Sequence, residues 1–457
     1  MSQHPPHATA EQLSALAADL TAHGVDLVRV LWSDLHGVAR GKELAAAELP
    51  RFAGHGVAFC QAAMVTDLGG NPLRGPESDG SGWPDADARI DPGTLFRPGW
   101  LPGTAFLLAE VTDPAAGGTP LRFDPRSLLR RQIDRALALG LHPVVAPELE
   151  FYLLREDPAA AHGWRAYLDR DTSGYVVGTL YDPDDMLPLL IRECRALGLG
   201  VHGGIQEFSG GQFEINHSHG PALDAADRAF LFKYAVKELA ARHRMRATFM
   251  GKPFADRAGS GSHTHLSLTD ASGTNLFASD DDGTGDGLTP LTRSFVAGLL
   301  DHAPALMAVL NPNVNAYKRL AAEGSLAPTH ATWGYDNRLA YARIPPERGP
   351  GARVEVRIGD AASNPYLALA ALLAAGLDGV ERDLAPPPPI SGDRGDAGPG
   401  LPASLGAALE ALERDKVLAD ALGERFTEVY CALKRQELAR FERAVTDWEF
   451  HEYSWML

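Results

Sequence analysis

The stretch APELEF, residues 146–151, places two glutamates, Glu148 and Glu150, in an otherwise apolar segment. The surrounding run LHPVVAPELEFYLL is rich in β-branched, aromatic and leucine residues, which predicts a buried or half-buried strand. Side chains two apart in a strand point to the same face, so we expect the two carboxylates side by side. Because neighbouring carboxylates repel and are costly to bury, we expect a positive group between them.

The composition limits the class of protein. The chain has 457 residues, 45% of them hydrophobic, and two domains are expected. The sequence has neither a long apolar run typical of a transmembrane helix nor a secretory signal pattern. Its three cysteines, Cys60, Cys194 and Cys431, are scattered without metal-ligand spacing. This scatter and the lack of a signal pattern together favour a reducing, cytoplasmic setting. The net charge of −17 argues against nucleic acid or a membrane as a partner, but is compatible with a small anionic substrate beside clustered arginines.

The chain divides into two predicted domains. Residues 1–115 form a small α+β domain in this interpretation, with a helix in EQLSALAADLTAHG and then a strand, an Asp34–Gly37 turn and a strand in 25–44. Residues 116–457 form the larger domain, whose first helix is expected in SLLRRQIDRALALG. Residues 383–400 are rich in proline and glycine and predict an exposed loop, and the tail after them is strongly helical.

Three further segments carry charged side chains in apolar or glycine-rich surroundings. These are Glu207 and Glu214 around a Gly-Gly turn in QEFSGGQFEIN, His263 and His265 in GSGSHTHLSL, and Arg353, Glu355 and Arg357 in ARVEVRIGD. Any one such pair alone is more often the solvated face of an antiparallel strand. At least four strands of this kind in one chain make that interpretation less convincing, and we expect the side chains to converge.

Carboxylates with an imidazole on one sheet face are ligands for hard divalent cations such as Mg²⁺ or Mn²⁺, whereas the lack of thiolates disfavours structural zinc. Four arginines, Arg319, Arg338, Arg343 and Arg357, follow within a short stretch. Metal ions with clustered arginines are what phosphoryl transfer requires, because both neutralise and hold phosphate oxygens. The sequence has no Walker-type phosphate loop.

Taken together, these motifs resemble the glutamine synthetase superfamily over nearly the whole chain, and they occur in the family's order. They are DPRSLL (124–129), APELEF (146–151), QEFSGGQFEI (206–215), ATFMGKPFADRAGSGSHTHLSL (247–268), NPNVNAYKRL (311–320), WGYDNR (333–338), RIP (343–345) and RVEVRIGDAASNPYLALAAL (353–372). The resemblance implies an α+β fold, with a β-grasp-like N-terminal domain and a catalytic domain on a curved antiparallel sheet. It also implies a cytoplasmic homo-oligomer, a dodecamer of two hexameric rings, with active sites shared between subunits.

The resemblance further implies a role for each site residue. Two or more Mg²⁺ or Mn²⁺ ions would be held by Glu150, Glu207 and Glu214 on one side and by Glu148, His263 and Glu355 on the other. The neighbouring glutamates of APELEF would thus each face a different cation. Glu207, His265, Ser267 and Arg343 match nucleotide-binding positions, Arg319, Arg357 and Gly259 match positions around glutamate, and Arg338, Arg343 and Arg357 match catalytic positions. ATP would phosphorylate the γ-carboxylate of glutamate, and an amine would then displace phosphate.

The sequence departs from the family pattern where ammonium binds. Cys60, in AFCQAA, aligns with an aspartate of the family's ammonium site, and Leu326, in GSLAP, takes the place of the flap glutamate. Ala258 also replaces an asparagine before the Gly-Ser-Gly stretch. Losing the ammonium carboxylates while keeping the metal ligands and arginines predicts a different nucleophile, as in the similar γ-glutamylpolyamine and γ-glutamylethanolamide synthetases.

Three hypotheses follow from the sequence. The favoured one is a ligase joining glutamate to a primary amine other than ammonia; the alternatives are an ammonia-using glutamine synthetase and a non-catalytic structural or regulatory subunit. Within the first, ethanolamine, a diamine or polyamine, and a small monoamine stay open. A polycation would favour an acidic patch, for which Asp67, Glu77 and Glu323 are candidates.

Overall fold

The N-terminal part of the chain is a helix packed on a small mixed sheet. The computed structural model describes residues 8–74, 82–160, 162–170, 173–278, 285–321 and 326–457. The first elements are α1 (Ala10–Ala22), β1 (Leu27–Ser33), β2 (Ala39–Ala45), η1 (Ala46–Phe52), β3 (Val57–Cys60), η2 (Gln61–Val65), β4 (Asp85–Ile90), β5 (Thr104–Asp113), η4 (Pro114–Ala116) and β6 (Thr119–Pro120). The predicted helix and the predicted hairpin are present, and β1 of that hairpin lies parallel to β5 in the order β2-β1-β5-β4-β3.

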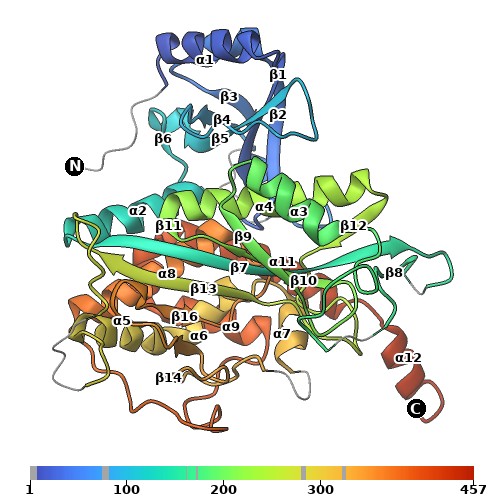
Figure 1. The fold of residues 1–457 in the computed structure, drawn as a ribbon, viewed down its shortest axis with the longest axis vertical. Coiled ribbons are helices and arrows are strands. Elements are labelled where there is room, and N and C mark those ends of the chain that lie inside the picture. Colours follow the sequence, from blue (N-terminus) through green and yellow to red (C-terminus); the bar gives the residue numbers. More distant parts are fainter. Residues whose placement is uncertain (1–7, 75–81, 161, 171–172, 279–284, 322–325) are drawn as a thin grey trace.

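The predicted hairpin turn is built as its sequence indicates. The Asp34 carboxylate accepts hydrogen bonds from the backbone N–H groups of His36 and Val38 and from Arg40, and Gly37 adopts a left-handed φ of 78°. A Cβ at Gly37 would also lie 3.1 Å from the backbone of Asn364 in the larger domain. The turn therefore contacts the catalytic part of the chain, as the descent of β1 and β2 towards it in Figure 1 indicates.

The larger part of the chain is a second sheet with helices packed against it. Its strands are β7 (His142–Glu156), β8 (Trp164–Ala166), β9 (Val201–Gln206), β10 (Gln212–His217), β11 (Gly220–Pro221), β12 (Met245–Thr248), β13 (Ser262–Thr269), β14 (Trp333–Tyr335), β15 (Ala342–Ile344) and β16 (Val354–Val356). Its helices are α2 (Pro125–Ala138), α3 (Met186–Ala196), α4 (Ala222–Arg242), α5 (Pro290–Asp301), α6 (Ala303–Leu310), α7 (Val314–Leu320), α8 (Pro365–Glu381), α9 (Leu405–Arg414), α10 (Lys416–Leu422), α11 (Glu424–Glu442) and α12 (Asp447–Tyr453), with η5 at Gly349–Gly351.

The strands run in the order β14-β15-β16-β13-β7-β10-β9, with β7 and β13 the long central pair (Figure 1). All the neighbours in this order are antiparallel except β14 and β15, which are parallel. The predicted α+β class and largely antiparallel catalytic sheet are therefore confirmed. The division at residues 115 and 116 stays a prediction, and β6 extends the first sheet as far as Pro120 by pairing with β5.

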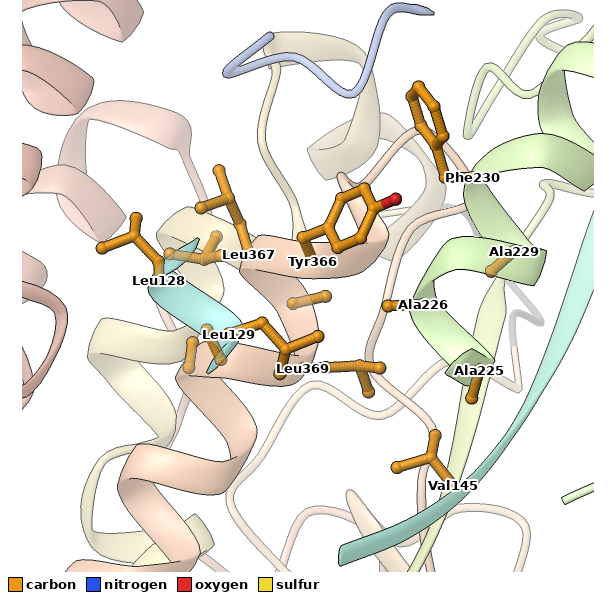
Figure 2. Close-up of a cluster of buried hydrophobic side chains, with 14 of the residues drawn as sticks. Leu128, Leu129, Val145, Ala225, Ala226, Ala229, Phe230, Tyr366, Leu367 and Leu369 are labelled. Atoms are coloured by element: carbon orange, nitrogen blue, oxygen red, sulfur yellow. The ribbon is translucent and has the colours of Figure 1, made fainter. Parts of the chain in front are cut away.

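A buried cluster fixes β7 against the helices. Figure 2 shows Val145 of β7 with side chains of α2, α4 and α8, among them Leu128, Ala226 and Leu369. Tyr366 of α8 donates a hydrogen bond to Asp227 of α4, which also accepts from Arg126 of α2. One face of β7 is thereby packed on helices, and its other face is left for polar side chains.

Candidate active site

The central strand β7 carries the two glutamates on the face away from the helices. Along β7 the odd-numbered residues from Pro143 to Phe151 are buried and the even-numbered ones are half-buried. Phe151 lies against Phe232 of α4, with 6.1 Å between ring centroids, so the odd-numbered face is the packed one. Glu148 and Glu150 therefore share the other face, as their spacing predicted.

Neighbouring strands add an acid and a histidine to this face. Glu214 of β10 is paired with Glu150, and His263 of β13 is paired with Glu148. Directly opposite residues on antiparallel strands project to the same side, about 5 Å apart. Two further histidine contacts follow: Nδ1 of His263 lies 3.4 Å from Glu148, and Nε2 of His265 lies 3.1 Å from the other oxygen of Glu148.

The strands β16 and β15 add Glu355 and two arginines. Glu355 is paired with His265 of β13 and with Arg343 of β15. Arg343 donates to one Glu355 oxygen at 2.6 Å, and Arg357 donates to the other. The Nδ1 atom of His263 lies 3.9 Å from Glu355. Glu355 is thus held between arginines while it borders the glutamate and histidine cluster.

Ligand atoms on this face gather into overlapping groups that could hold metal ions. Within each group the atoms lie within 4.8 Å of one another: Glu150, Glu207 and Glu214; Glu148, Glu214 and His263; and Glu148, His265 and Glu355. The first group is the predicted set for one metal. His265 groups with Glu148 and Glu355, and the predicted His263 groups with Glu148 and Glu214 and also lies 3.9 Å from Glu355. The predicted assignment of His263 to the second metal stays a prediction.

Two of these carboxyls are protonated more readily than ordinary ones. Burial, and next the Glu150 carboxylate, raise the pKa of Glu207 to about 7. Burial, and then the carboxylates of Glu148 and Glu150, raise the pKa of Glu214 to about 8. Both shifts arise because several buried carboxylates share one small volume, and a divalent cation between them would remove the cause.

The other two carboxyls with shifted pKa values have cationic or imidazole partners. Burial acts to raise the pKa of Glu148, but hydrogen bonds from His263 and His265 outweigh it and hold that pKa well below its usual range. Burial also acts to raise the pKa of Glu355, but the positive charge of Arg357 has the larger effect together with the other cationic neighbours. The pKa of Glu355 is therefore lowered. The site thus contains both ionised carboxylates and carboxyls that lack a counter-charge.

This donor set fits hard divalent cations. Carboxylate oxygens and imidazole nitrogens suit Mg²⁺ and Mn²⁺, and the cluster has no thiolate among the residues that the structure describes. The raised pKa values of Glu207 and Glu214 arise from burial and from the same crowding of carboxylates, which a divalent cation would relieve. Bound ions would be held by Glu148, Glu150, Glu207, Glu214, Glu355 and a histidine, and they would neutralise phosphate oxygens during transfer.

A cavity of about 450 Å³ opens beside the cluster. It is lined by His265 and Ser267, two of the predicted nucleotide-binding residues, together with Glu148 and Arg353. Arg353 donates from Nε to Nδ1 of His265 at 3.1 Å and so orients that ring. Glu207 and Arg343, the other two predicted nucleotide residues, lie in the neighbouring carboxylate cluster instead of lining this cavity.

The predicted arginines take three different positions. Arg319 is buried, and its Nη2 donates to the carbonyls of Ile358 at 2.6 Å and Gly359 at 3.0 Å. Arg357 is also buried and donates from Nε to the carbonyl of Arg338 at 3.1 Å. Arg338 itself is exposed, and its charge acts on Glu207 to lower that pKa. Gly259, the last predicted glutamate-site residue, is pressed against Arg319, since a Cβ there would lie 2.5 Å from the arginine Cγ.

The two predicted acceptor residues lie apart. Leu326 is 54% exposed, at a place where an incoming molecule can contact it. Cys60 ends β3 of the N-terminal sheet, where its thiol is exposed and lies 3.8 Å from the carbonyl of Trp83. Figure 1 places β3 well away from β7 and β13, so one chain does not bring Cys60 to its own metal cluster.

Of the three residues considered for an acidic patch, only Asp67 lies in the described part of the chain. Asp67 is buried and accepts from Arg440 at 2.6 Å and from Gln436 at 3.2 Å, so its charge is already paired. Glu77 and Glu323 lie outside the residues that the structure describes.

Several polar residues of the site were not predicted. Gln212 donates to Glu150 at 3.3 Å and to the carbonyl of Gly259 at 3.0 Å, and Asn216 donates to Glu214 at 2.9 Å. Asp360, fully buried, has an oxygen 3.7 Å from Nε of Arg319. Both amides flank the predicted Glu214 in QFEIN, and their same-face spacing was the available signal.

The geometry defines a class: a metal-dependent phosphoryl-transfer site in which carboxylates and arginines converge on a sheet beside a cavity large enough for a nucleotide. The comparisons agree with this class. The family model for the glutamine synthetase catalytic domain matches residues 122–453. The chain belongs to the glutamine synthetase family and is an ATP-dependent carbon–nitrogen ligase.

Individual relatives include proteins named glutamine synthetase and one named glutamate–isopropylamine ligase. A glutamine synthetase of Halobacterium salinarum is 34% identical over 96% of each chain. A glutamate–isopropylamine ligase of a Pseudomonas species is 35% identical over 94% of this chain and 95% of its own. The solved structure of GmaS without ligand is similar with a TM-score of 0.85 and 35% identity, covering 96% of this chain and 99% of that one. In the described part of the chain, no helix combines the length and apolar character needed to span a membrane.

Proposed function

We propose that this protein joins the γ-carboxylate of glutamate to a primary amine other than ammonia, with ATP as the energy source. The observation that carries the proposal is the acceptor region. By the resemblance of the motifs, Leu326 matches the family's flap glutamate and Cys60 matches a second carboxylate, and in this structure both side chains are exposed. The similarity to a glutamate–isopropylamine ligase and to GmaS supports this assignment.

The chemistry has two steps. An oxygen of the γ-carboxylate attacks the γ-phosphorus of ATP, the bond to the leaving ADP oxygen breaks, and γ-glutamyl phosphate forms. The neutral amine nitrogen then attacks the acyl carbon, the bond to the phosphate oxygen breaks, and the nitrogen loses a proton. We assign Arg319 and Arg357 to glutamate binding and Arg338 and Arg343 to the phosphates, where bidentate guanidinium groups hold oxyanions.

Ammonium is a poor fit for the acceptor region. It is compact and strongly hydrated, so binding it requires charged acceptors that replace its water. Neither Leu326 nor Cys60 supplies a carboxylate, whereas an alkylamine gains roughly 0.8 kcal/mol for each CH₂ group that it buries. The amine must also be neutral to attack, so we expect rates to rise towards alkaline pH.

The test is a panel of acceptors. Phosphate release with ATP, glutamate and Mg²⁺ gives kcat/KM for ammonium, methylamine, isopropylamine, ethanolamine and putrescine at one pH. We expect at least one amine to exceed ammonium by about tenfold or more. Leu326→Glu should raise kcat/KM for ammonium relative to kcat/KM for the amines. Leu326→Gln, which has the shape of glutamate without its charge, should not change this ratio. A wild-type protein that prefers ammonium over every amine would show that the proposal is wrong.

A further inference from the structure

The side chain of Gln212 joins two parts of the active site. Gln212 lies on β10 two residues before Glu214, so it is on the face of the sheet that carries the carboxylates. It is 1% exposed, and its Nε2 donates to Glu150 at 3.3 Å and to the carbonyl of Gly259 at 3.0 Å. Glu150 belongs to one of the groups that could hold a metal ion, and Gly259 is one of the residues predicted around glutamate. One amide therefore contacts both the metal group and the segment assigned to the substrate.

These two acceptors fix the orientation of the amide. A carboxylate and a carbonyl oxygen only accept hydrogen bonds, so the amide nitrogen must face them, and it has one hydrogen for each. The other end of the amide, Oε1, is buried and has no hydrogen-bond partner among the residues that the structure describes. The planar group is thus oriented by Glu150 and Gly259 alone. It cannot keep both hydrogen bonds if only one of the two acceptors moves.

The carboxylate of Glu150 is attached to the same segment a second time. Its Oε2 accepts from Gln212 and also from the backbone N–H of Gly261 at 2.8 Å. The backbone N–H of Glu150 donates to the carbonyl of Gly261 at 3.2 Å. Residues 259–261 are therefore bound to Glu150 both directly and through Gln212, so a cation that fixes this carboxylate also restricts the segment.

Gly259 lies against a second residue of the predicted glutamate site. A Cβ at Gly259 would lie 2.5 Å from Cγ of Arg319. The preceding carbonyl, that of Ala258, accepts from the hydroxyl of Tyr152 at 2.7 Å. Tyr152 on β7 is paired with Gln212 on β10, so one cross-strand pair holds two consecutive carbonyls. The position of the Gly259 carbonyl beside Arg319 thus depends on Gln212.

We infer that Gln212 is a positioning residue that couples metal binding to glutamate binding. The inference rests on the proposed function in taking glutamate as the substrate that is phosphorylated. A cation that fixes Glu150 fixes the amide of Gln212, and the amide fixes the Gly259 carbonyl. Glutamate then binds a segment that is already ordered, which lowers the entropic cost of binding. By linkage, glutamate must raise the affinity for the cation by the same factor.

The test measures this factor by calorimetry, without ATP or amine. The dissociation constant of glutamate is determined with and without saturating Mn²⁺, and that of Mn²⁺ with and without saturating glutamate. The two ratios should agree and should be about tenfold or more in the wild-type protein, within the usual range for coupled sites. Gln212→Met keeps the length of the side chain without its N–H groups and should lower the factor to about twofold. The remainder comes from direct attraction between the cation and the carboxylates of glutamate.

Two variants serve as controls. Asn216 is a second amide on the same face of β10, and it donates to Glu214 at 2.9 Å. Asn216→Ala removes that hydrogen bond and leaves the one to Gly259 in place, so it should alter the affinity for Mn²⁺ but not the coupling factor. Tyr152→Phe removes the hydroxyl that holds Ala258 and leaves Gln212 intact. It should weaken glutamate binding equally with and without Mn²⁺.

The outcomes separate this inference from the proposed function. A wild-type protein that binds no glutamate in the presence of Mn²⁺, even with ADP added, contradicts the proposed function itself. A wild-type protein that binds glutamate equally well with and without Mn²⁺ overturns the inference without the need for any variant. A wild-type coupling factor in Gln212→Met also overturns it and leaves the proposed function standing. An equal loss of coupling in Asn216→Ala and Gln212→Met overturns it too, because the effect would then be general to the carboxylate cluster.

Discussion

Glu214 lies where the metal groups overlap: it shares one with Glu150 and Glu207 and another with Glu148 and His263. Without a cation its pKa is raised to about 8 by burial and by Glu148 and Glu150, and the pKa of Glu207 is raised to about 7. Metal binding needs both groups ionised, so protons must leave as the ion enters. The affinity for Mg²⁺ or Mn²⁺ should therefore increase as pH rises from 6 to 8.5.

The raised pKa values of Glu207 and Glu214 also make the stability of the metal-free protein depend on pH, in a direction that follows from the shifts. A folded pKa above the unfolded value of about 4.5 means that the folded state binds the proton more tightly. That stabilisation is complete below about pH 4.5 and is lost as pH rises through 7 and 8. We expect the increase in melting temperature caused by Mg²⁺ to be larger at pH 8.5 than at pH 6, measured by thermal denaturation with and without the ion.

Glu214→Gln should remove most of this difference between the two pH values and weaken Mn²⁺ binding by at least tenfold. The control is Glu410→Gln, which changes an exposed glutamate on α9 that pairs with the neighbouring Arg414 at 3.2 Å. A melting-temperature increase of equal size at pH 6 and pH 8.5 in the wild-type protein would contradict the assignment.

At the residue scale, the sequence predicted side-chain positions correctly where they depend on a local rule, the alternation of side chains along a strand. The period of two in β7 and β13 predicted which side of each strand Glu148, Glu150, His263 and His265 occupy. It could not predict that Glu150 faces Glu214 or that Glu148 contacts both histidines, because strand register depends on pairings between distant segments. Gln212 and Asn216 share the face of Glu214 by the same period of two, but they were missed because the prediction considered only charged side chains.

At the scale of elements, the turn between β9 and β10 sets the separation of Glu207 and Glu214. The predicted Gly-Gly turn is confirmed, and the structure shows why glycine is required there. A Cβ at Gly210 would lie 2.0 Å from the carbonyl oxygen of Arg170 and 2.4 Å from that of Leu168. Gly211 has a left-handed φ of 81°, and a Cβ there would lie 2.9 Å from the backbone nitrogen of Tyr167. The turn therefore packs closely against residues 167–170.

Gly210→Ala should displace this turn, since backbone atoms cannot move aside as a flexible side chain can. We expect a loss of about 1–3 kcal/mol in stability, typical of overpacking, and a fall of at least tenfold in kcat as Glu207 and Glu214 separate. Gly203→Ala on β9 is the matched control, because a Cβ there has open space. Equal kcat values and Mn²⁺ affinities for the two variants would show that the turn does not position the carboxylates.

The sequence does not predict cavities, which form between elements that are distant along the chain. A second cavity, of about 210 Å³, is lined by Val177, Leu187 and Ile205, which come from three separate segments, and each is an ordinary apolar residue in its own context. This cavity exists only because α3 packs beside the edge strand β9. The sequence pointed to the acceptor region through Leu326 and Cys60, which are substitutions in recognisable motifs, and gave no indication of the space behind Tyr175.

At the scale of the whole molecule, Cys60 raises the question of how the acceptor site is completed. In space, the N-terminal sheet lies at the opposite end of the molecule from β14 (Figure 1). The strands β7 and β13, which carry the metal cluster, lie between the two. If Cys60 contributes to an acceptor site, it does so in another subunit, which agrees with the predicted ring in which the N-terminal domain of one chain faces the catalytic domain of the next. That assembly, a dodecamer by resemblance, stays a prediction.

The segment 445–457 offers a second reason to expect assembly. Figure 1 shows α12 extending from the body of the molecule. Val445 is 82% exposed, Trp448 63%, Phe450 65% and Trp455 91%, so exposed apolar side chains follow one another along α12 and the residues that flank it. Apolar surface of this extent is costly in water and typically marks a protein–protein interface. We expect this segment to be buried against another copy of the chain.

Removing residues 445–457 should therefore reduce the assembled mass, measured by light scattering coupled to gel filtration. The double variant Trp448→Ser with Trp455→Ser should have the same effect, because it removes two large apolar side chains that are 63% and 91% exposed in one chain. Val417→Ser is the control, since Val417 is a 42% exposed apolar residue on α10. If acceptor sites are shared between subunits, loss of assembly should reduce amine transfer more than Mn²⁺ binding, because β7, β10, β13 and β16 supply the metal cluster within one chain. A monomeric wild-type protein with full activity would contradict both the assembly and the shared site.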